Sequence, residues 1–140
     1  MSKLIDNTSC HCLKMRRSAE NTILFYDSML KPAGITARQY SLLYQIRRNP
    51  GCSVRGLSDA VLLDRSTLAR SLKPLFNADL IEDVSDKRAR DNSLYLTEYG
   101  NEVCAQAEKL WEKAQQVFED KVGSENVKLL EEILLSLQTL

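Results

Sequence analysis

The sequence predicts a mainly α-helical fold with one small β-hairpin, in a single domain of 140 residues. Apolar residues recur at spacings of three and four along most of the chain, which is the period of an amphipathic helix. Good N-cap residues (Ser, Thr or Asp) stand before several of these periodic stretches. Near residues 93–97, by contrast, apolar and polar residues alternate, which predicts a half-buried strand.

The first helix is expected from about residue 9 to residue 31, after a polar stretch, residues 1–8, that is expected to be loosely ordered. Pro32 cannot continue a helix and Gly34 tolerates the exit conformation, so the helix ends there. One face carries apolar residues at helical spacing. They are Met15, Ala19, Ile23, Tyr26 and Leu30.

The second helix has the clearest start in the chain. Thr36 and Gln39 form a capping box, in which each side chain satisfies a backbone amide near the other residue. Ile35 and Tyr40 occupy the positions of a hydrophobic staple around that start. The helix is expected to stop at Asn-Pro-Gly, residues 49–51.

Two short helices separated by a tight turn follow. Ser53 is the expected N-cap of a helix from about Val54 to Val61, and Asp64 that of a helix reaching about Ala78. The second of these helices has an apolar back and a cationic, hydrogen-bonding front. The back consists of Leu68, Leu72, Leu75 and Phe76, and the front of Arg65, Ser66, Arg70, Lys73 and Asn77.

A hairpin is expected next, with strands at residues 80–84 and 93–97 around a polar tip. The tip contains Lys87, Arg88 and Arg90. A helix, a turn, a second helix and a hairpin with a basic tip make up the winged helix-turn-helix arrangement, so residues 36–97 are expected to form a DNA-binding lobe.

The C-terminal third is expected to form two helices. Thr97 caps a long helix to about Val122, Gly123 interrupts it, and Ser124 is expected to cap the last helix. Both helices have more apolar positions than a two-helix hairpin buries against itself. A second subunit is the natural cover, and closed two-fold dimers are the commonest oligomers.

The charges are unevenly distributed, although the formal net charge is zero. Residues 1–97 carry a net charge of +5 and residues 98–140 a net charge of −5. A basic front and an acidic rear orient a protein on DNA. The sequence contains no run of eighteen apolar residues, so no membrane span is predicted. The N-terminus lacks an apolar signal-peptide core, so a cytoplasmic protein is expected.

The four cysteines are expected to be reduced thiols in such a protein. Cys10 and Cys12 flank His11, but this spacing does not match the paired ligands of structural zinc sites. No metal and no cofactor are therefore expected. Cys10 and Cys12 lie just before two arginines, Arg16 and Arg17, which favour a thiolate and make oxidation a possible switch.

The order and spacing of these segments resemble the MarR family of bacterial transcription regulators over nearly the whole chain. The resemblance implies a dimeric DNA-binding regulator whose terminal helices, about residues 9–31 and 98–140, form the dimer interface. Family members usually have an Asp two residues before the wing Arg, whereas counting back from Thr97 puts that Arg at Arg90 and leaves Arg88 where Asp is usual. The matching segments are Arg16-Arg17, Gly34-Ile-Thr-Ala, Leu57-Ser-Asp-Ala-Val, Leu63-Asp-Arg-Ser-Thr-Leu-Ala-Arg, Leu80-Ile-Glu and Leu96-Thr-Glu-Tyr-Gly.

Each part of the DNA-binding lobe has an expected role. Arg65 and Arg70 are candidates for guanine, because a guanidinium can bond O6 and N7 together. The wing arginines are expected to reach the flanking minor groove, where narrow A·T-rich stretches attract Arg. The major-groove set is Arg65, Ser66, Thr67, Arg70 and Lys73, the wing set is Lys87, Arg88 and Arg90, and the secondary phosphate contacts are Arg38, Arg47, Arg48 and Arg55.

The resemblance also implies a small-molecule pocket between the DNA-binding lobe and the dimer helices, often open to aromatic acids. Arg17, Tyr26, Tyr40 and Tyr44 are the expected lining residues. Oxidation of Cys10 or Cys12 is the alternative switch. In either case the expected function is that of a homodimeric repressor on a pseudo-palindromic operator.

Two other function classes fit the sequence less well. A winged helix that binds a protein instead of DNA is the alternative, but basic residues on both the helix front and the wing argue against it. An enzyme is not expected, because the chain has one His and neither a Gly-rich phosphate loop nor a metal-ligand pattern.

Overall fold

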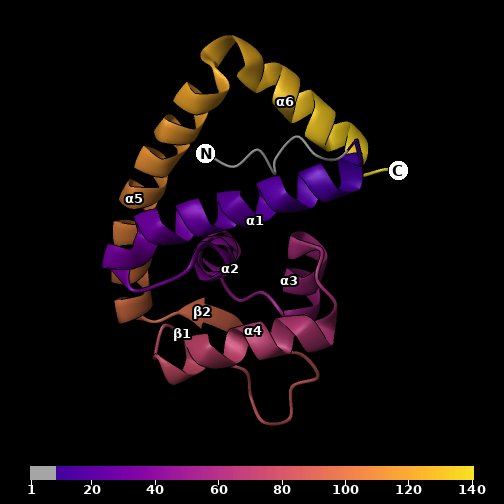
Figure 1. The fold of residues 1–140 in the computed structure, drawn as a ribbon. Helices are drawn as coiled ribbons and strands as arrows, with labels where there is room; N and C mark the ends of the chain where they lie inside the picture. Colours follow the sequence, from indigo (N-terminus) through magenta and orange to yellow (C-terminus); the bar gives the residue numbers. More distant parts are fainter. Residues whose placement is uncertain (1–8) are drawn as a thin grey trace.

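The computed structural model describes residues 9–140 and has the expected mainly α-helical fold with one hairpin (Figure 1). The expectation of loose order in residues 1–8 lies outside the described residues. The elements are α1 (His11–Leu30), the 3-10 turn η1 (Lys31–Ala33), α2 (Ala37–Arg48), α3 (Val54–Val61), α4 (Arg65–Asn77), β1 (Ile81–Asp83), β2 (Leu94–Leu96), α5 (Glu98–Val122) and α6 (Ser124–Leu137).

The capping box at the start of α2 is confirmed. The Gln39 amide donates to the Thr36 hydroxyl at 3.2 Å, and the Thr36 amide donates to the Gln39 side chain at 2.9 Å. The predicted cap at Ser124 is wrong, because Gly123 (φ 95°) is the residue that both ends α5 and precedes α6. Ser124 is thereby the first residue inside α6, where its hydroxyl makes no capping bond.

The core of the DNA-binding lobe surrounds α2, which Figure 1 shows end-on near the middle of the molecule. Leu43 and Ile46 of α2 are completely buried, together with Leu68 and Leu75 of α4. The sequence predicted Phe76 on this buried face as well. That prediction is wrong, because the Phe76 side chain is 40% exposed. It follows Leu75 by one position, and one helical step turns a side chain by about 100°.

The hairpin is short and is attached to its neighbours at both ends. β1 and β2 pair antiparallel with Ile81 opposite Leu96, so each strand is shorter than the expected five residues. Cys52, in the loop after α2, extends this pairing through a bridge to Leu94. At the other end Gly100 of α5 lies against the Leu80 carbonyl oxygen so closely that a Cβ would overlap it. Helix α5 therefore starts in a fixed position relative to the wing.

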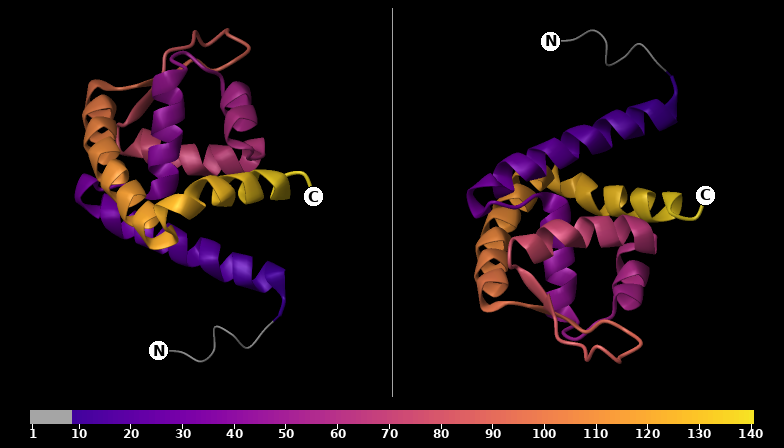
Figure 2. Two further views of the ribbon diagram at one scale, coloured as in Figure 1. Left: turned by 90° about the horizontal axis from the view of Figure 1, so that it is seen from above. Right: turned by 90° about the horizontal axis from the view of Figure 1, so that it is seen from below.

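The terminal helices form an open frame around one side of the lobe. In the view of Figure 1 α1, α5 and α6 outline a triangle, with α1 packed on α5 and with α6 turning back from the far end of α5. Figure 2 shows that α1 and α6 diverge from each other away from α5. Helix α6 buries no residue within the described chain. The large apolar side chains that remain exposed on this frame include Ile23, Leu24, Val117, Leu129, Ile133, Leu134 and Leu135.

Candidate nucleic-acid interface

Helix α4 presents its cationic front because its start is capped and its back is buried. The Asp64 carboxylate accepts hydrogen bonds from the Thr67 amide and the Ser66 hydroxyl, both at 3.0 Å. The Thr67 side chain first, then the Ser66 hydroxyl and the Thr67 amide, lower the pKa of Asp64 below its ordinary value. A negative cap also suits the positive end of the helix dipole. The sequence predicted this cap correctly.

The predicted major-groove residues lie on one side of α4, and most are exposed. Arg65, Ser66, Arg70 and Lys73 are exposed, whereas Thr67 is half-buried. The Thr67 hydroxyl accepts a long hydrogen bond of 3.4 Å from the Arg70 guanidinium. Thr67 therefore supports Arg70, beside which Arg65, Ser66 and Lys73 are exposed.

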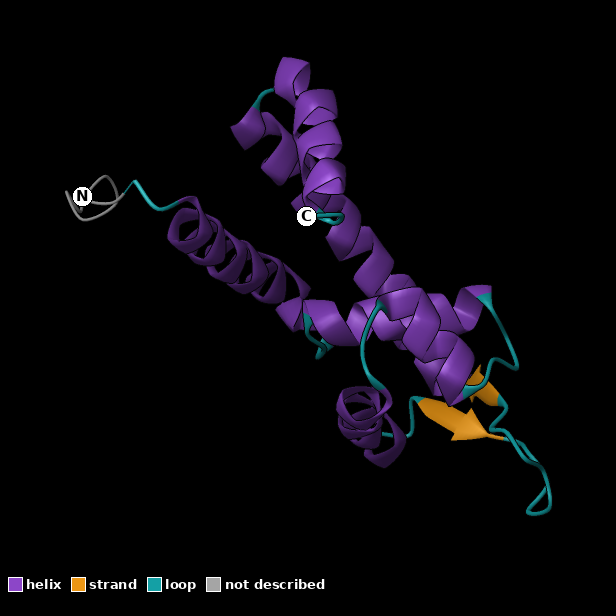
Figure 3. Cartoon of the chain, turned by 90° about the vertical axis from the view of Figure 1, so that its right-hand side faces the viewer, coloured by secondary structure: helices purple, strands orange, loops and turns teal. Residues whose placement is uncertain are grey.

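The wing is braced at its base by Asp83, a residue that sequence reasoning missed. Its carboxylate accepts bonds from the Asn92 side-chain amide at 2.8 Å and from the backbone amides of Ser85 and Ser93 at 3.0 Å each. The bond from Asn92 contributes most to holding the pKa of Asp83 well below its usual range. One carboxylate thus joins the outgoing and the returning arm of the wing, which Figure 3 shows projecting away from the helices.

A second carboxylate shapes the tip of the wing. The Arg88 amide donates to the Asp86 carboxylate at 3.2 Å, and the Ala89 amide donates to the Asp86 carbonyl oxygen at 2.8 Å. An Asp that bonds the amide two residues ahead is the signature of an Asx turn. The Asp that is absent at position 88 therefore has local counterparts in Asp86 at the tip and Asp83 at the base. Lys87, Arg88 and Arg90 are all exposed.

A hollow between α3, α4 and the wing brings together residues that lie far apart in the sequence. It has a volume of about 430 Å³ and is lined by Arg55, Arg65, Arg90 and Asp91. Arg65 and Arg90 belong to the predicted DNA-binding set, and Arg55 was only a secondary phosphate candidate. The structure therefore connects the start of the recognition helix to the returning arm of the wing.

A second cavity, of about 300 Å³, lies between α2 and α5. Tyr40 is central to it, with its ring centroid 6.2 Å from that of Tyr44 and 6.2 Å from that of Trp111. Burial, and then the nearby Glu108, raises the pKa of Tyr40 to about 12, so its hydroxyl stays a hydrogen-bond donor at neutral pH. Ser41 and Glu108 complete the lining.

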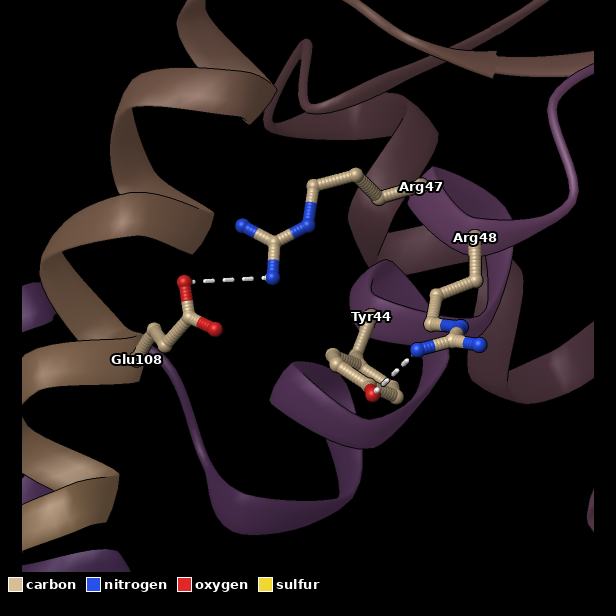
Figure 4. A network of polar contacts seen from close by, with 4 residues as sticks. All are labelled: Tyr44, Arg47, Arg48 and Glu108. Carbon is tan, nitrogen blue, oxygen red and sulfur yellow. Dashed lines mark hydrogen bonds and ion pairs between the residues drawn. The ribbon is translucent and has the colours of Figure 1, made fainter.

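Charged side chains form a network beside this cavity (Figure 4). Arg47 forms an ion pair with Glu108, with 3.2 Å between Nη2 and Oε2, and so connects α2 to α5. Arg48 donates to the Tyr44 hydroxyl at 3.3 Å. Both guanidinium carbons lie near the Tyr44 ring, 5.6 Å from its centroid for Arg47 and 5.8 Å for Arg48. Arg47, a secondary phosphate candidate, is thus half-buried and paired with a residue of the protein itself.

Only two of the four predicted ligand residues, Tyr40 and Tyr44, line the cavity between α2 and α5. The Tyr26 hydroxyl instead donates to the Gln115 side chain, and its ring lies 6.2 Å from that of Phe118. Arg17 is exposed on α1 and is not part of the lining. Sequence reasoning missed Glu108 and Trp111, although their spacing of three places them together on the inner side of α5.

The cysteines divide into two exposed and two covered thiols. Cys10 and Cys12 are exposed at the start of α1. Burial raises the pKa of Cys52 and of Cys104, which keeps both as unreactive thiols at neutral pH. Among residues 9–140, no three His, Cys, Asp or Glu side chains are grouped to hold a metal ion. No helix in the same part of the chain is long and apolar enough to cross a membrane.

Comparison with known proteins decides the family. A sequence model of the MarR family matches residues 33–89, from the turn after α1 to the tip of the wing. The transcriptional regulator BilQ of Clostridium symbiosum, an HTH-type protein, is 36% identical over 109 residues, which cover 75% of this chain and 71% of BilQ. The chain belongs to the MarR family. Proteins of the MarR family are transcription regulators and not enzymes.

Solved structures show the same winged-helix fold over nearly the full length of this chain. The repressor CouR bound to a 23-mer DNA duplex superimposes with a TM-score of 0.86 at 19% identity, covering 99% of each chain. PcaV of Streptomyces coelicolor, in complex with its natural ligand, gives a TM-score of 0.83 at 23% identity, covering 99% of this chain and 96% of PcaV. At such identities the agreement is one of fold.

The Asp83 brace predicts a local change in the wing of this MarR-family protein. Asp83→Ala removes the acceptor that joins the two arms, so trypsin is expected to cut faster at Lys87, Arg88 and Arg90 while the helices stay folded by circular dichroism. Asp59→Ala, at an exposed position of α3, is the control and should leave the cleavage rate unchanged. Equal cleavage of wild type and Asp83→Ala would show that the brace does not order the wing.

The brace also has a defined pH dependence. Because the folded-state pKa of Asp83 is lowered, its contribution is complete above the ordinary carboxyl range and is lost as pH falls through the lower folded value. Hydrogen exchange of the Ser85 and Ser93 amides, corrected for intrinsic rates, should therefore stay constant from pH 7 to about 4, the ordinary pKa of Asp. A loss of protection between pH 7 and 5 would contradict this assignment.

Proposed function

We propose that this protein is a sequence-specific repressor that binds double-stranded DNA as a homodimer in the cytoplasm, on a pseudo-palindromic operator. The observation that carries the proposal is the exposed cationic front of α4 beside a wing that is braced and basic. An α-helix of this kind fits the major groove, where each base pair presents a distinct pattern of donors and acceptors. DNA-bound relatives such as CouR support it.

The side chains have different expected roles. Arg65 and Arg70 are proposed to contact bases, and Ser66 and Thr67 to contact bases or phosphate. Lys73 and Lys87 are proposed to contact phosphates, which supply affinity and salt dependence. The wing tip, with Arg88, is proposed to approach the neighbouring minor groove.

The homodimer is proposed from the open frame of α1, α5 and α6. Ile133 is 47% exposed, Leu134 is 44% exposed and Leu135 is 67% exposed, although all three are apolar. A second copy of the same frame would remove this surface from water, at roughly 25 cal/mol for each Å² of apolar area. Two-fold symmetry then gives two recognition helices facing two half-sites.

The switch is proposed at the cavity between α2 and α5. A small aromatic acid would stack on Tyr40 and Trp111, and its carboxylate would compete with Glu108 for Arg47. Because the Arg47–Glu108 ion pair connects the DNA-binding lobe to a terminal helix, such a ligand would favour a different relative position of the two. The ligand complex of PcaV supports a small-molecule switch. Oxidation of the exposed Cys10 or Cys12 is the alternative.

The DNA contacts can be tested by fluorescence anisotropy with the protein's own upstream DNA at several salt concentrations. Arg70→Ala should cost about 1–3 kcal/mol on the cognate site and relax base preference there. Lys87→Ala should weaken all DNA equally and flatten the salt slope by about one unit. Lys109→Ala, on α5, is the control and should change neither quantity.

If both variants bind like wild type, the proposed face is wrong. If the wild-type protein binds no DNA at all while it remains folded, the alternative of a winged helix that binds protein is favoured instead.

The homodimer can be tested by sedimentation at micromolar concentration. Leu134→Asp places a charge on the exposed apolar face of α6 and should convert the dimer into a monomer, because an unpaired buried charge is costly. Glu132→Gln on the same helix is the control and should remain dimeric. A wild-type protein that sediments as a monomer would contradict the proposal.

The switch can be followed through Trp111, the single tryptophan of the chain. Benzoate should change its fluorescence and weaken DNA binding, and Glu108→Gln should bind benzoate more tightly because Arg47 is released. Tyr26→Phe is the control and should respond like wild type. If benzoate has no effect but peroxide weakens DNA binding in wild type and not in a Cys10→Ser, Cys12→Ser variant, the thiol switch is the correct one.

A further inference from the structure

Three arginines from three separate elements meet around the hollow between α3, α4 and the wing. Arg55 comes from the first turn of α3, Arg65 is the first residue of α4, and Arg90 lies on the returning arm of the wing. Asp91 is the fourth lining residue. Three guanidinium groups and one carboxylate give the hollow a formal charge of +2.

The three guanidinium groups have no partner within residues 9–140. Neither a hydrogen bond nor an ion pair involves the side chain of Arg55, Arg65 or Arg90 in that part of the chain. Arg47 and Arg70, by contrast, each contact a neighbouring side chain. A protein gains nothing for its own stability from gathering like charges, so such a cluster is a candidate site for an anion.

The two arginines of the wing differ in their surroundings. The Asp86 turn puts Arg88 at the exposed tip, away from the hollow. Arg90 lies beyond the turn, two residues before Asn92, which Asp83 binds, and it lines the hollow together with Arg55. The wing is held in a shape that points one arginine outward and turns the other toward α3 and α4.

We propose that the hollow formed by Arg55, Arg65 and Arg90 is a seat for one backbone phosphate of DNA. Arg88 then enters the minor groove in place of Arg90, in contrast to the expectation from the sequence that both wing arginines do so. This rests on the proposed DNA-binding function. A phosphate offers several acceptor oxygens, and guanidinium groups bind it through paired hydrogen bonds from different directions. The seat fixes the register of the recognition helix without reading sequence, whereas Arg88 responds to the width of the groove.

Asp91 tunes this seat. Its carboxylate lies in the same hollow and repels a phosphate, so it weakens the attraction of the three arginines without abolishing it. Asp91→Asn keeps the size and removes the charge. It is therefore expected to bind all DNA more tightly, which a purely structural role of Asp91 would not produce.

The experiment measures the affinity and salt slope of each variant on the operator, on the operator with its flanks changed from A·T to G·C, and on unrelated DNA. Arg55→Ala and Arg90→Ala should each weaken binding by the same factor on every DNA. Each should also reduce the slope of log affinity against log salt by up to about one unit, which is the contribution of a single phosphate. Arg88→Ala should instead reduce the preference for A·T flanks. Thermal unfolding of each variant checks that the fold is intact.

A single uncharged methylphosphonate, moved along the operator, then locates the phosphate. At one position the difference between wild type and Arg90→Ala should disappear, and Arg55→Ala should share that position. If Arg90→Ala alters the flank preference and leaves the salt slope unchanged, or if no common position is found, the seat is refuted while DNA binding stands. If wild type binds no DNA, the proposed function itself fails, and with it the seat.

Discussion

The packing of α2 is the constraint on which the rest of the structure depends. Leu43 and Ile46 lie at the centre of the lobe, completely buried. The start of α2 is held from outside by Asp27 of α1, whose carboxylate accepts from the Ala37 amide at 2.8 Å. Its end runs into the loop that pairs with β2. Helices α1, α3 and α5 and the hairpin all contact α2, so α2 connects the DNA-binding lobe to the terminal helices.

Carboxylates hold in place the elements that carry the basic residues of this protein. Asp64 caps the helix that carries Arg65 and Arg70, Asp83 and Asp86 shape the wing, and Glu108 holds Arg47. The formal neutrality of the chain is consistent with this arrangement. Asp64, Asp83 and Asp86 of the lobe bond backbone amides of the segments that carry the cations, and the acidic excess of residues 98–140 lies on the terminal helices.

The sequence predicted local structure well wherever a single residue type determines it. The caps at Thr36, Ser53, Asp64 and Thr97 are each confirmed, because an N-cap depends on residues at most three positions away. The predicted cap at Ser124 failed because a glycine with positive φ was available one residue earlier. Phe76 failed because an apolar residue at the edge of a helical face is buried only when a neighbouring element covers it.

The parts of the site that depend on distant residues were harder to predict. Asp83 reaches Asn92 and Ser93 across the wing, and no pattern in either arm indicates that contact. Tyr26 is an aromatic residue of the type expected in a ligand pocket, but its hydroxyl donates to the Gln115 side chain of α5. Arg55 and Arg90 lie 35 positions apart and meet only because the hairpin folds back beside α3. Such juxtapositions follow from tertiary packing, which local pattern does not specify.

The junction at Gly123 has a mechanical consequence. Gly123 is both the C-cap of α5 and the N-cap of α6, so the two helices are joined at a sharp bend with no linker between them. With 25 residues, α5 is a lever about 37 Å long, at about 1.5 Å for each residue. Tilting it by about 5° moves its far end by roughly 3 Å, close to the rise of one base pair, about 3.4 Å. In a two-fold assembly so small a rotation would shift both recognition helices out of register with the DNA helix.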